Sequence, residues 1–254
     1  MKKLIRKIAI VSAVLSMLAV SVPAQQQGQR PIDRLKYPPL KFTPPVAQKV
    51  VLPNGTTVFL LEDSELPLVN MFALIRTGGR LDPPGKAGLA QLTATVLRTG
   101  GTKSLKPDEI NQKLEFVAAS VETDMDTQYG TASLSTLSKD LDTVLPVFAD
   151  VLMNPGFDPG QIEIARGQML DAIKRQNDSP QEIAQRVFPQ IIYGRHSPLA
   201  ESPTEESVKS ITRDDIEAFY RQYYSAGDVT LGISGDIHKD AILKKIEDAF
   251  AGWK

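Results

Sequence analysis

The chain has 254 residues, of which 42% are hydrophobic and 23% charged, and a formal net charge of -1. These proportions are ordinary for a globular protein with a large core. A near-neutral chain without a basic stripe disfavours nucleic acid as a partner, because that binding depends on clustered Lys and Arg. The sequence holds no cysteine, which excludes disulfides and a thiol nucleophile.

The N-terminus is typical of a secretory signal peptide. Basic residues between Lys2 and Lys7 precede an apolar run from about Ile8 to Val20, and Val22-Pro23-Ala24 forms a small-residue cleavage pattern. The apolar run is shorter than the roughly 20 residues that span a bilayer, which disfavours a membrane anchor. We expect a signal peptide over residues 1–24. After its cleavage we expect a periplasmic or secreted chain that is not bound to the membrane.

The next segment, residues 25–45, begins with Gln25-Gln26-Gln27-Gly28 and then carries repeated prolines. Proline lacks a backbone donor and fixes φ, so this density of prolines disfavours both a helix and a strand. We expect a Pro-rich linker.

Strand patterns begin at Ala47–Leu52 and Thr56–Leu61, joined by Pro53-Asn54-Gly55. The Asn-Gly pair tolerates the positive φ of a tight hairpin turn. Leu68–Ile75 is a third and more apolar strand. A helix is expected from about Ala87 to Leu97, after a loop rich in Pro and Gly.

A second helix is expected from Lys106 to Phe116, followed by two alternating strands at Val117–Thr123 and Gln128–Leu134. Val229–Ser234 is the last expected strand. Further helices are expected at Lys139–Met153, Pro159–Gln176, Pro180–Tyr193, Thr212–Tyr224 and His238–Phe250. The order predicts a single α+β domain over residues 46–254, with an antiparallel sheet covered by helices.

Several segments, in the same order, resemble the N-terminal half of the pitrilysin/insulinase zinc peptidases, the inverted zincins. Leu52–Thr56 resembles the opening L-x-N-G-L hairpin, and Tyr193–Leu199 resembles the Y-G-x-H-P-L loop. Ile216–Tyr224 together with Val229–Asp236 is similar to the ending F-Y-x-x-x-Y-x-P-x-N-x-x-L-x-V-x-G-D. The resemblance spans about Val46 to the C-terminus and implies the fold of one half-domain. Members of the two-chain type usually carry two half-domains per chain, which leaves open that the sequence is a fragment.

The segment Gly88–Thr95 resembles the G-x-A-H-x-x-E-H helix of this family. In that motif two His, one helical turn apart, hold zinc, and the Glu between them activates water. The three positions read Gln91, Ala94 and Thr95 here. The resemblance therefore implies that the motif helix is present without its catalytic side chains.

The family's third zinc ligand is a Glu on the long helix before its D-x-P segment. Aligning Asp178-Ser179-Pro180 with that segment places the ligand at Ala172, and a supporting acid at Ala165. Zinc prefers imidazole, thiolate or carboxylate. The chain's 2 histidines, His196 and His238, lie outside the motif helix, so no shift of register restores the pair. We expect no catalytic residue and no bound zinc or other cofactor.

Other chemical patterns favour ordinary structural roles. Glu122, Asp124 and Asp126 alternate along one strand and are expected to be solvated. Asp214-Asp215 lies where a helix begins, and its charge complements the helix dipole. The sequence contains no G-x-S-x-G nucleophile elbow and no phosphate-binding loop.

The favoured hypothesis is a non-catalytic, peptidase-like subunit. The resemblance implies a chamber built from several half-domains, in which an extended peptide adds as a strand to a sheet edge near the zinc helix. The expected partners are a peptide and either a zinc-bearing homologue or a second half-domain. Two alternatives stay open: an active zinc metalloendopeptidase with a displaced metal site, and an envelope scaffold or binding module without a peptide role. The expected peptide contacts are Val117, Ala119, Val121 and Thr123.

Overall fold

The computed structural model of the chain describes residues 42–195 and 197–253. The expected signal peptide at 1–24, most of the expected linker at 25–45, and His196 lie outside the described residues. Contacts between residues group Pro45–Lys254 into one compact unit.

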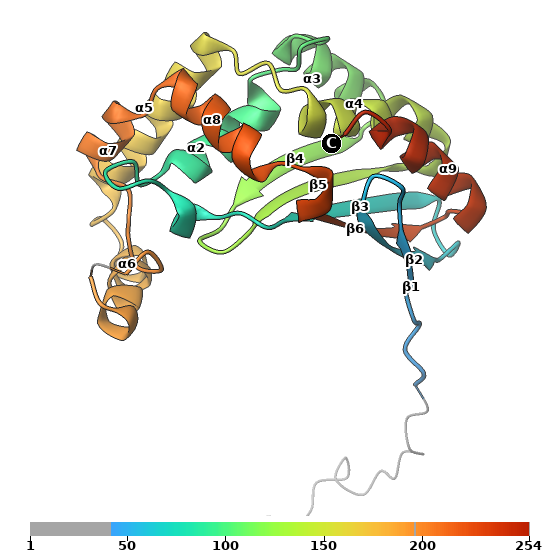
Figure 1. Cartoon of the computed structure of the whole chain (residues 1–254), viewed down its shortest axis with the longest axis horizontal. Coiled ribbons are helices and arrows are strands. Elements are labelled where there is room, and N and C mark those ends of the chain that lie inside the picture. Colours follow the sequence, from blue (N-terminus) through green and yellow to red (C-terminus); the bar gives the residue numbers. More distant parts are fainter. Residues whose placement is uncertain (1–41, 196, 254) are drawn as a thin grey trace, which may run out of the picture. The chain divides into compact units, whose positions relative to one another are not determined.

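The centre of this unit is a six-stranded sheet with the strand order β1-β2-β6-β3-β5-β4 (Figure 1). All neighbouring strands run antiparallel except β2 and β6, which run parallel. The expected α+β class is confirmed, and the parallel pair arises because β6 enters the sheet from the far end of the chain. The strands are β1 (Gln48–Val51), β2 (Thr57–Glu62), β3 (Leu68–Ile75), β4 (Ser120–Met125), β5 (Gly130–Leu137) and β6 (Val229–Gly235).

Helices cover one face of this sheet, whereas α6 lies on the opposite side (Figure 1). No helix within residues 42–195 and 197–253 is long and apolar enough to cross a bilayer. The helices are α2 (Leu89–Thr99), α3 (Pro107–Phe116), α4 (Leu141–Met153), α5 (Pro159–Arg175), α6 (Pro180–Tyr193), α7 (Glu205–Ser210), α8 (Arg213–Tyr223) and α9 (Lys239–Phe250).

Two differences from the expected elements have local causes. The strand expected from Val117 begins only at Ser120, because Val117 ends α3 and Ala118 adopts a left-handed φ of 50°. Helix α7 was not predicted, although its N-terminus carries a sequence signal. The Thr204 hydroxyl accepts a hydrogen bond from the Ser207 backbone N–H, and the Ser207 hydroxyl accepts one from the Thr204 N–H.

The core lies between the sheet and its helical layer. Alternate residues of β3 are buried, from Val69 to Ile75, because successive side chains of a strand point to opposite faces. Helix α4 contributes the apolar side of the layer, and its Phe148 packs edge-on against Phe250 of α9 at a ring distance of 6.3 Å.

Helix α2 begins at a cap supplied from a preceding loop. Its N-cap is Gly88, with φ 98°, which has no side chain to satisfy the first backbone N–H groups. The Asp82 carboxylate takes that role and accepts hydrogen bonds from the backbone N–H of Gly88 (2.7 Å) and of Ala90 (2.8 Å). Burial raises the pKa of Asp82 to about 6, although these backbone donors partly oppose the increase.

This pKa predicts how stability depends on pH. The folded chain holds the Asp82 proton more tightly than the unfolded chain, whose value is near 3.8. The contribution of this carboxyl to the free energy of unfolding is therefore fully present below about pH 4 and declines as pH rises through 6. Relative to the Asp82→Asn variant, we expect the wild type to lose up to about 3 kcal/mol between pH 4 and pH 7.

Urea unfolding of both proteins at steps across that range measures the difference. A difference that stays constant, or that grows in favour of the wild type as pH rises, would contradict the assignment.

Candidate functional site

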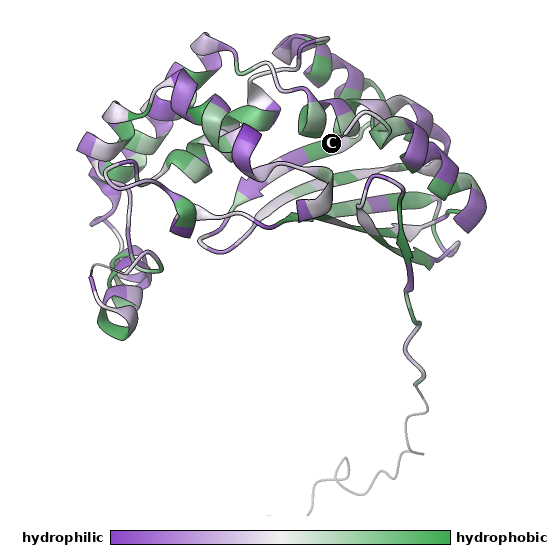
Figure 2. Cartoon of the chain, in the orientation of Figure 1, coloured by the Kyte–Doolittle hydropathy of each residue, from purple (hydrophilic) through white to green (hydrophobic). Residues whose placement is uncertain are grey.

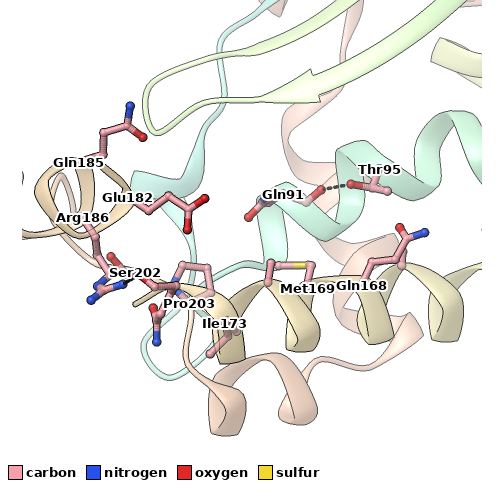
Figure 3. Close-up of a pocket in the computed structure, with 13 residues that line it drawn as sticks. Gln91, Thr95, Gln168, Met169, Ile173, Glu182, Gln185, Arg186, Ser202 and Pro203 are labelled. Carbon is pink, nitrogen blue, oxygen red and sulfur yellow. Dashed lines mark hydrogen bonds between the residues drawn. The ribbon is translucent and has the colours of Figure 1, made fainter. Parts of the chain in front are cut away.

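Helices α2 and α5 lie side by side, and a pocket of about 680 Å³ opens along them (Figure 3). Four of the five positions that the resemblance assigned to a metal site line this pocket: Gln91, Thr95, Ala165 and Ala172. The remaining position, Ala94, is buried and is not among the residues that line the pocket. The other lining residues are Gln168, Met169, Ile173, Gln176, Glu182, Gln185, Arg186, Ser202 and Pro203.

Gln91 and Thr95 lie one helical turn apart, so both point from α2 toward α5. The Thr95 hydroxyl donates to the Gln91 backbone carbonyl at 3.0 Å, which engages its only proton within the helix. Figure 3 shows this bond beside the Gln91 side chain. The exposed Gln91 amide is thus the more available polar group of the pair.

The α5 side of the pocket offers methyl groups where the resemblance implies carboxylates. Ala165 is buried against the helical layer, whereas Ala172 is exposed at the pocket wall. The guanidinium of Arg166 donates to Glu163 on its own helix and to the Val208 carbonyl on α7. Arg166 therefore holds α5 against α7 and does not enter the pocket.

These side chains do not fit a zinc ion. The pocket presents four glutamine amides, one carboxylate and one guanidinium, none of which gives the imidazole, thiolate or clustered carboxylates of a zinc site. Within residues 42–195 and 197–253, no three His, Cys, Asp or Glu side chains gather closely enough to hold a metal ion. His238 precedes α9, outside this pocket. No catalytic step can be derived through a metal here.

The pocket is suited instead to hydrogen bonding with a polar chain. An amide side chain both donates and accepts, as does a peptide group, so glutamines can pair with an extended backbone in more than one register. The pocket also has an apolar floor, to which Met169 and Ile173 contribute. That combination matches an extended peptide better than a small charged ligand.

Helix α6 forms a wall of the pocket that the sequence did not predict (Figure 3). Arg186 donates from its guanidinium to the Gln176 carbonyl (2.8 Å) and to the Asn177 side chain (2.7 Å). These bonds join α6 to the end of α5 and place Glu182 and Gln185 at the pocket. The available signal was the polar spacing of 182, 185 and 186 along one face of an amphipathic helix.

The expected peptide-binding edge is only partly a strand. β4 is the last strand of the sheet and includes Val121 and Thr123, but Val117 and Ala119 precede it. Both strand residues are tied to α2. Arg98 donates to the Val121 carbonyl at 2.8 Å, and the Thr123 hydroxyl donates to the Ala94 carbonyl at 2.7 Å.

The acidic residues have structural surroundings. Glu122 and Asp124 are exposed along β4, and Asp126 is exposed directly after its end. Asp215 belongs to the capping box of α8 and forms an ion pair with Lys86 at 2.8 Å. Both observations agree with solvated or helix-capping charges.

Two family profiles match this chain. The profile of the family described as "Insulinase (Peptidase family M16)" matches residues 57–203, and that described as "Peptidase M16 inactive domain" matches residues 210–254. The "Uncharacterized zinc protease YmxG" of Bacillus subtilis is 24% identical over 205 residues, which cover 79% of this chain and 49% of that protein. The mitochondrial "Cytochrome b-c1 complex subunit 1" of Rattus norvegicus is 25% identical and covers 82% of this chain and 43% of its own.

Solved structures extend the similarity to the fold. A peptidase M16 inactive domain from Pseudomonas fluorescens has a TM-score of 0.74 at 25% identity, covering 81% of this chain and 50% of that chain. The periplasmic protease PqqL from Escherichia coli has a TM-score of 0.74 at 17% identity, covering 83% and 24%. The chain thus spans about half the length of the curated relatives it matches. It belongs to the insulinase family, peptidase family M16.

Proposed function

We propose that this chain is a non-catalytic member of its family that binds extended peptide in the pocket between α2, α5 and α6. The observation that carries the proposal is the pocket itself. Its walls include the positions that the resemblance assigns to the family's zinc site, and those positions hold Gln91, Thr95, Ala165 and Ala172. The surrounding helices are retained, so the shape of a peptide site persists without groups that activate water.

The peptide is proposed to run between the pocket and the β4 edge. An edge strand presents unpaired backbone groups to which an extended chain can add. At Val121 the outward carbonyl already accepts from Arg98, so a peptide that pairs there has to displace this guanidinium. Burial lowers the pKa of Arg98, because the guanidinium has already lost part of its hydration in this position, so its displacement toward water restores hydration.

The partner in this proposal is a zinc-bearing homologue or a second half-domain, which would close a chamber over the pocket. Support comes from relatives that are about twice as long as the matched region. We place the protein in the periplasm or outside the cell, since its first residues have the pattern of a signal peptide and PqqL is described as periplasmic.

The amount of zinc that the chain binds tests whether the pocket fails to hold the ion only because it lacks zinc-ligating side chains. The wild-type chain, dialysed with zinc and then against buffer, is expected to retain much less than one ion per chain. The triple variant Gln91→His, Thr95→His, Ala172→Glu should retain about one ion per chain, because it restores two imidazoles and a carboxylate on the same helices. Elemental analysis by mass spectrometry measures both.

The matched control replaces the last change with Ala172→Gln, which keeps the size of the side chain without its charge. This variant should bind zinc more weakly, by about tenfold or more. Stoichiometric zinc in the wild type, together with chelator-sensitive peptide cleavage, would instead establish the alternative of an active peptidase with a displaced site.

Filling the pocket should block peptide binding. The Ala172→Trp variant places an indole in the pocket from an exposed position, so folding should be unaffected. We expect the affinity for short labelled peptides of varied sequence, measured by fluorescence anisotropy, to fall by about tenfold or more.

Ile164→Trp is the matched control for this experiment. Ile164 is 54% exposed on the same helix and is not among the residues that line the pocket. Its variant should bind peptides as the wild type does. Equal affinity in all three proteins would reject the pocket as the peptide site and favour a scaffold role.

A further inference from the structure

A small cavity lies at the start of α2, next to the pocket. It has a volume of about 110 Å³, and its lining residues include the carboxyl side chains of Asp82, Asp126 and Glu201. Gln91 and Pro203 line both this cavity and the pocket. A change at the cavity therefore reaches two residues of the pocket wall.

Asp82 and Glu201 bring two carboxyl groups into this cavity from distant parts of the chain. Hydrogen bonds from the backbone N–H groups of Gly88 and Ala90 fix the position of the Asp82 carboxyl. Burial raises the pKa of Asp82 to about 6 against these donors, and the charge of Glu201 adds to the increase. The two carboxylates repel each other strongly when both are charged, because a partly buried site screens charges less than water does.

Glu201 belongs to the segment 197–204, which joins α6 to α7. Among the described residues, the hydrogen bonds beside Glu201 are local, since two backbone N–H groups of the segment donate to the Ser197 carbonyl, at 2.8 and 3.1 Å. The segment meets the start of α2 through packing, because a Cβ at Gly88 would lie 3.2 Å from the Pro203 side chain. Movement of the segment away from α2 thus separates a packed contact.

We propose that Asp82 and Glu201 form a pH-dependent switch on the pocket. When both carboxylates are charged, their repulsion moves the segment 197–204 away from α2, and Ser202 and Pro203 leave the pocket wall (Figure 3). When Asp82 is protonated, the segment rests on α2 and the wall is complete. The effect on peptide binding rests on the proposed function, whereas the movement of the segment does not.

The direction of the effect follows from proton binding. With the segment on α2, the pKa of Asp82 is about 6, and with the segment away the carboxyl is hydrated and its pKa returns toward the ordinary value of 3.8. The closed arrangement therefore binds the proton more tightly, so it is favoured at low pH and is lost as pH rises through 6. The difference between the two pKa values limits the effect on the equilibrium to about 100-fold.

The other charged groups on the elements around Asp82 have partners or are open to water. They are Arg80 and Lys86 on its own loop, Asp126 after β4, Glu182 and Arg186 on α6, Glu205, Glu206 and Lys209 on α7, and Asp215 on α8. Histidine also titrates in this range, with an ordinary pKa of about 6.5. The chain has 2 histidines, His196 and His238, which the experiment removes.

The mobility of a spin label measures the movement without any peptide. The chain has no cysteine, so a Ser202→Cys variant takes a nitroxide label at one site. Its electron paramagnetic resonance spectrum is expected to show a label that becomes more mobile as pH rises through about 6. Asp82→Asn should abolish this transition, because the amide stays neutral. Glu201→Gln should move it to lower pH, and its exposed position keeps the test available if Asp82→Asn does not fold.

Two control variants isolate the carboxyl pair. Glu206→Gln removes the same charge from an exposed position on the adjoining helix α7, and Glu206 is not among the residues that line the cavity. The double variant His196→Gln, His238→Gln removes every imidazole of the chain. Both control variants should keep the transition of the parent protein.

Peptide affinity measures the effect on the pocket. Fluorescence anisotropy with labelled peptides that lack His, Asp and Glu should show binding to the unlabelled wild type that is about tenfold weaker at pH 7.5 than at pH 5. The Asp82→Asn variant should bind with nearly the same affinity at both pH values.

Several outcomes would overturn the switch. They are a label whose mobility stays constant from pH 5 to pH 7.5, a transition that survives Asp82→Asn, and a transition that the double histidine variant removes. Peptide affinity in the wild type that is equal at pH 5 and pH 7.5 would also overturn it. A mobility transition in a chain that binds no peptide at either pH would support the switch and reject the proposed function instead.

Discussion

The insertion of β6 between β2 and β3 organises the molecule, because it joins the two ends of the compact unit in the middle of one sheet. Polar contacts fix this arrangement at the hairpin between β1 and β2. The buried Thr56 hydroxyl donates to the Ala226 carbonyl, and the Asn54 side chain donates to the Phe250 carbonyl, each at 3.1 Å. At the other end of β6, Gly235 passes so close to Leu68 that a Cβ would lie 1.9 Å from its carbonyl oxygen. The central strand is thus held at both ends.

The pocket depends on this frame and not on a metal. Helix α2 rests on β4 and against α5 through buried residues such as Ala90, Leu92 and Ile162, which face away from the pocket. Structural zinc sites contribute folding free energy directly, and such domains unfold without the ion. Here apolar packing holds the two helices together, so Gln91, Thr95 and Ala172, at the positions that the resemblance assigns to zinc ligands, line a cavity between stable walls.

The sequence predicted what depends on local pattern. The apolar run of β3 and the helical period of α4 were sufficient to predict these elements, and the resemblance around Gly88–Thr95 indicated one wall of the pocket. Pairing of β2 with β6 was not predictable, since the two strands are far apart in sequence and nothing local specifies a parallel partner. The predicted start of β4 was wrong, because Ala118 adopts a left-handed φ that alanine does not signal in the sequence. The position of α6 rests on the tertiary bonds of Arg186, which periodicity cannot reveal.

Helix α6 also connects the pocket with an exposed apolar surface. Its polar face contributes Glu182, Gln185 and Arg186 to the pocket, and its opposite face carries an exposed apolar stripe around Phe188 and Ile191 (Figure 2). The described bonds from α6 to the body of the chain come from a single side chain, Arg186, so the helix has little other support. Whatever covers the stripe restricts the movement of the helix and with it one wall of the pocket. Occupation of the pocket restricts the same helix from its polar side, and by thermodynamic linkage the two effects on affinity are equal.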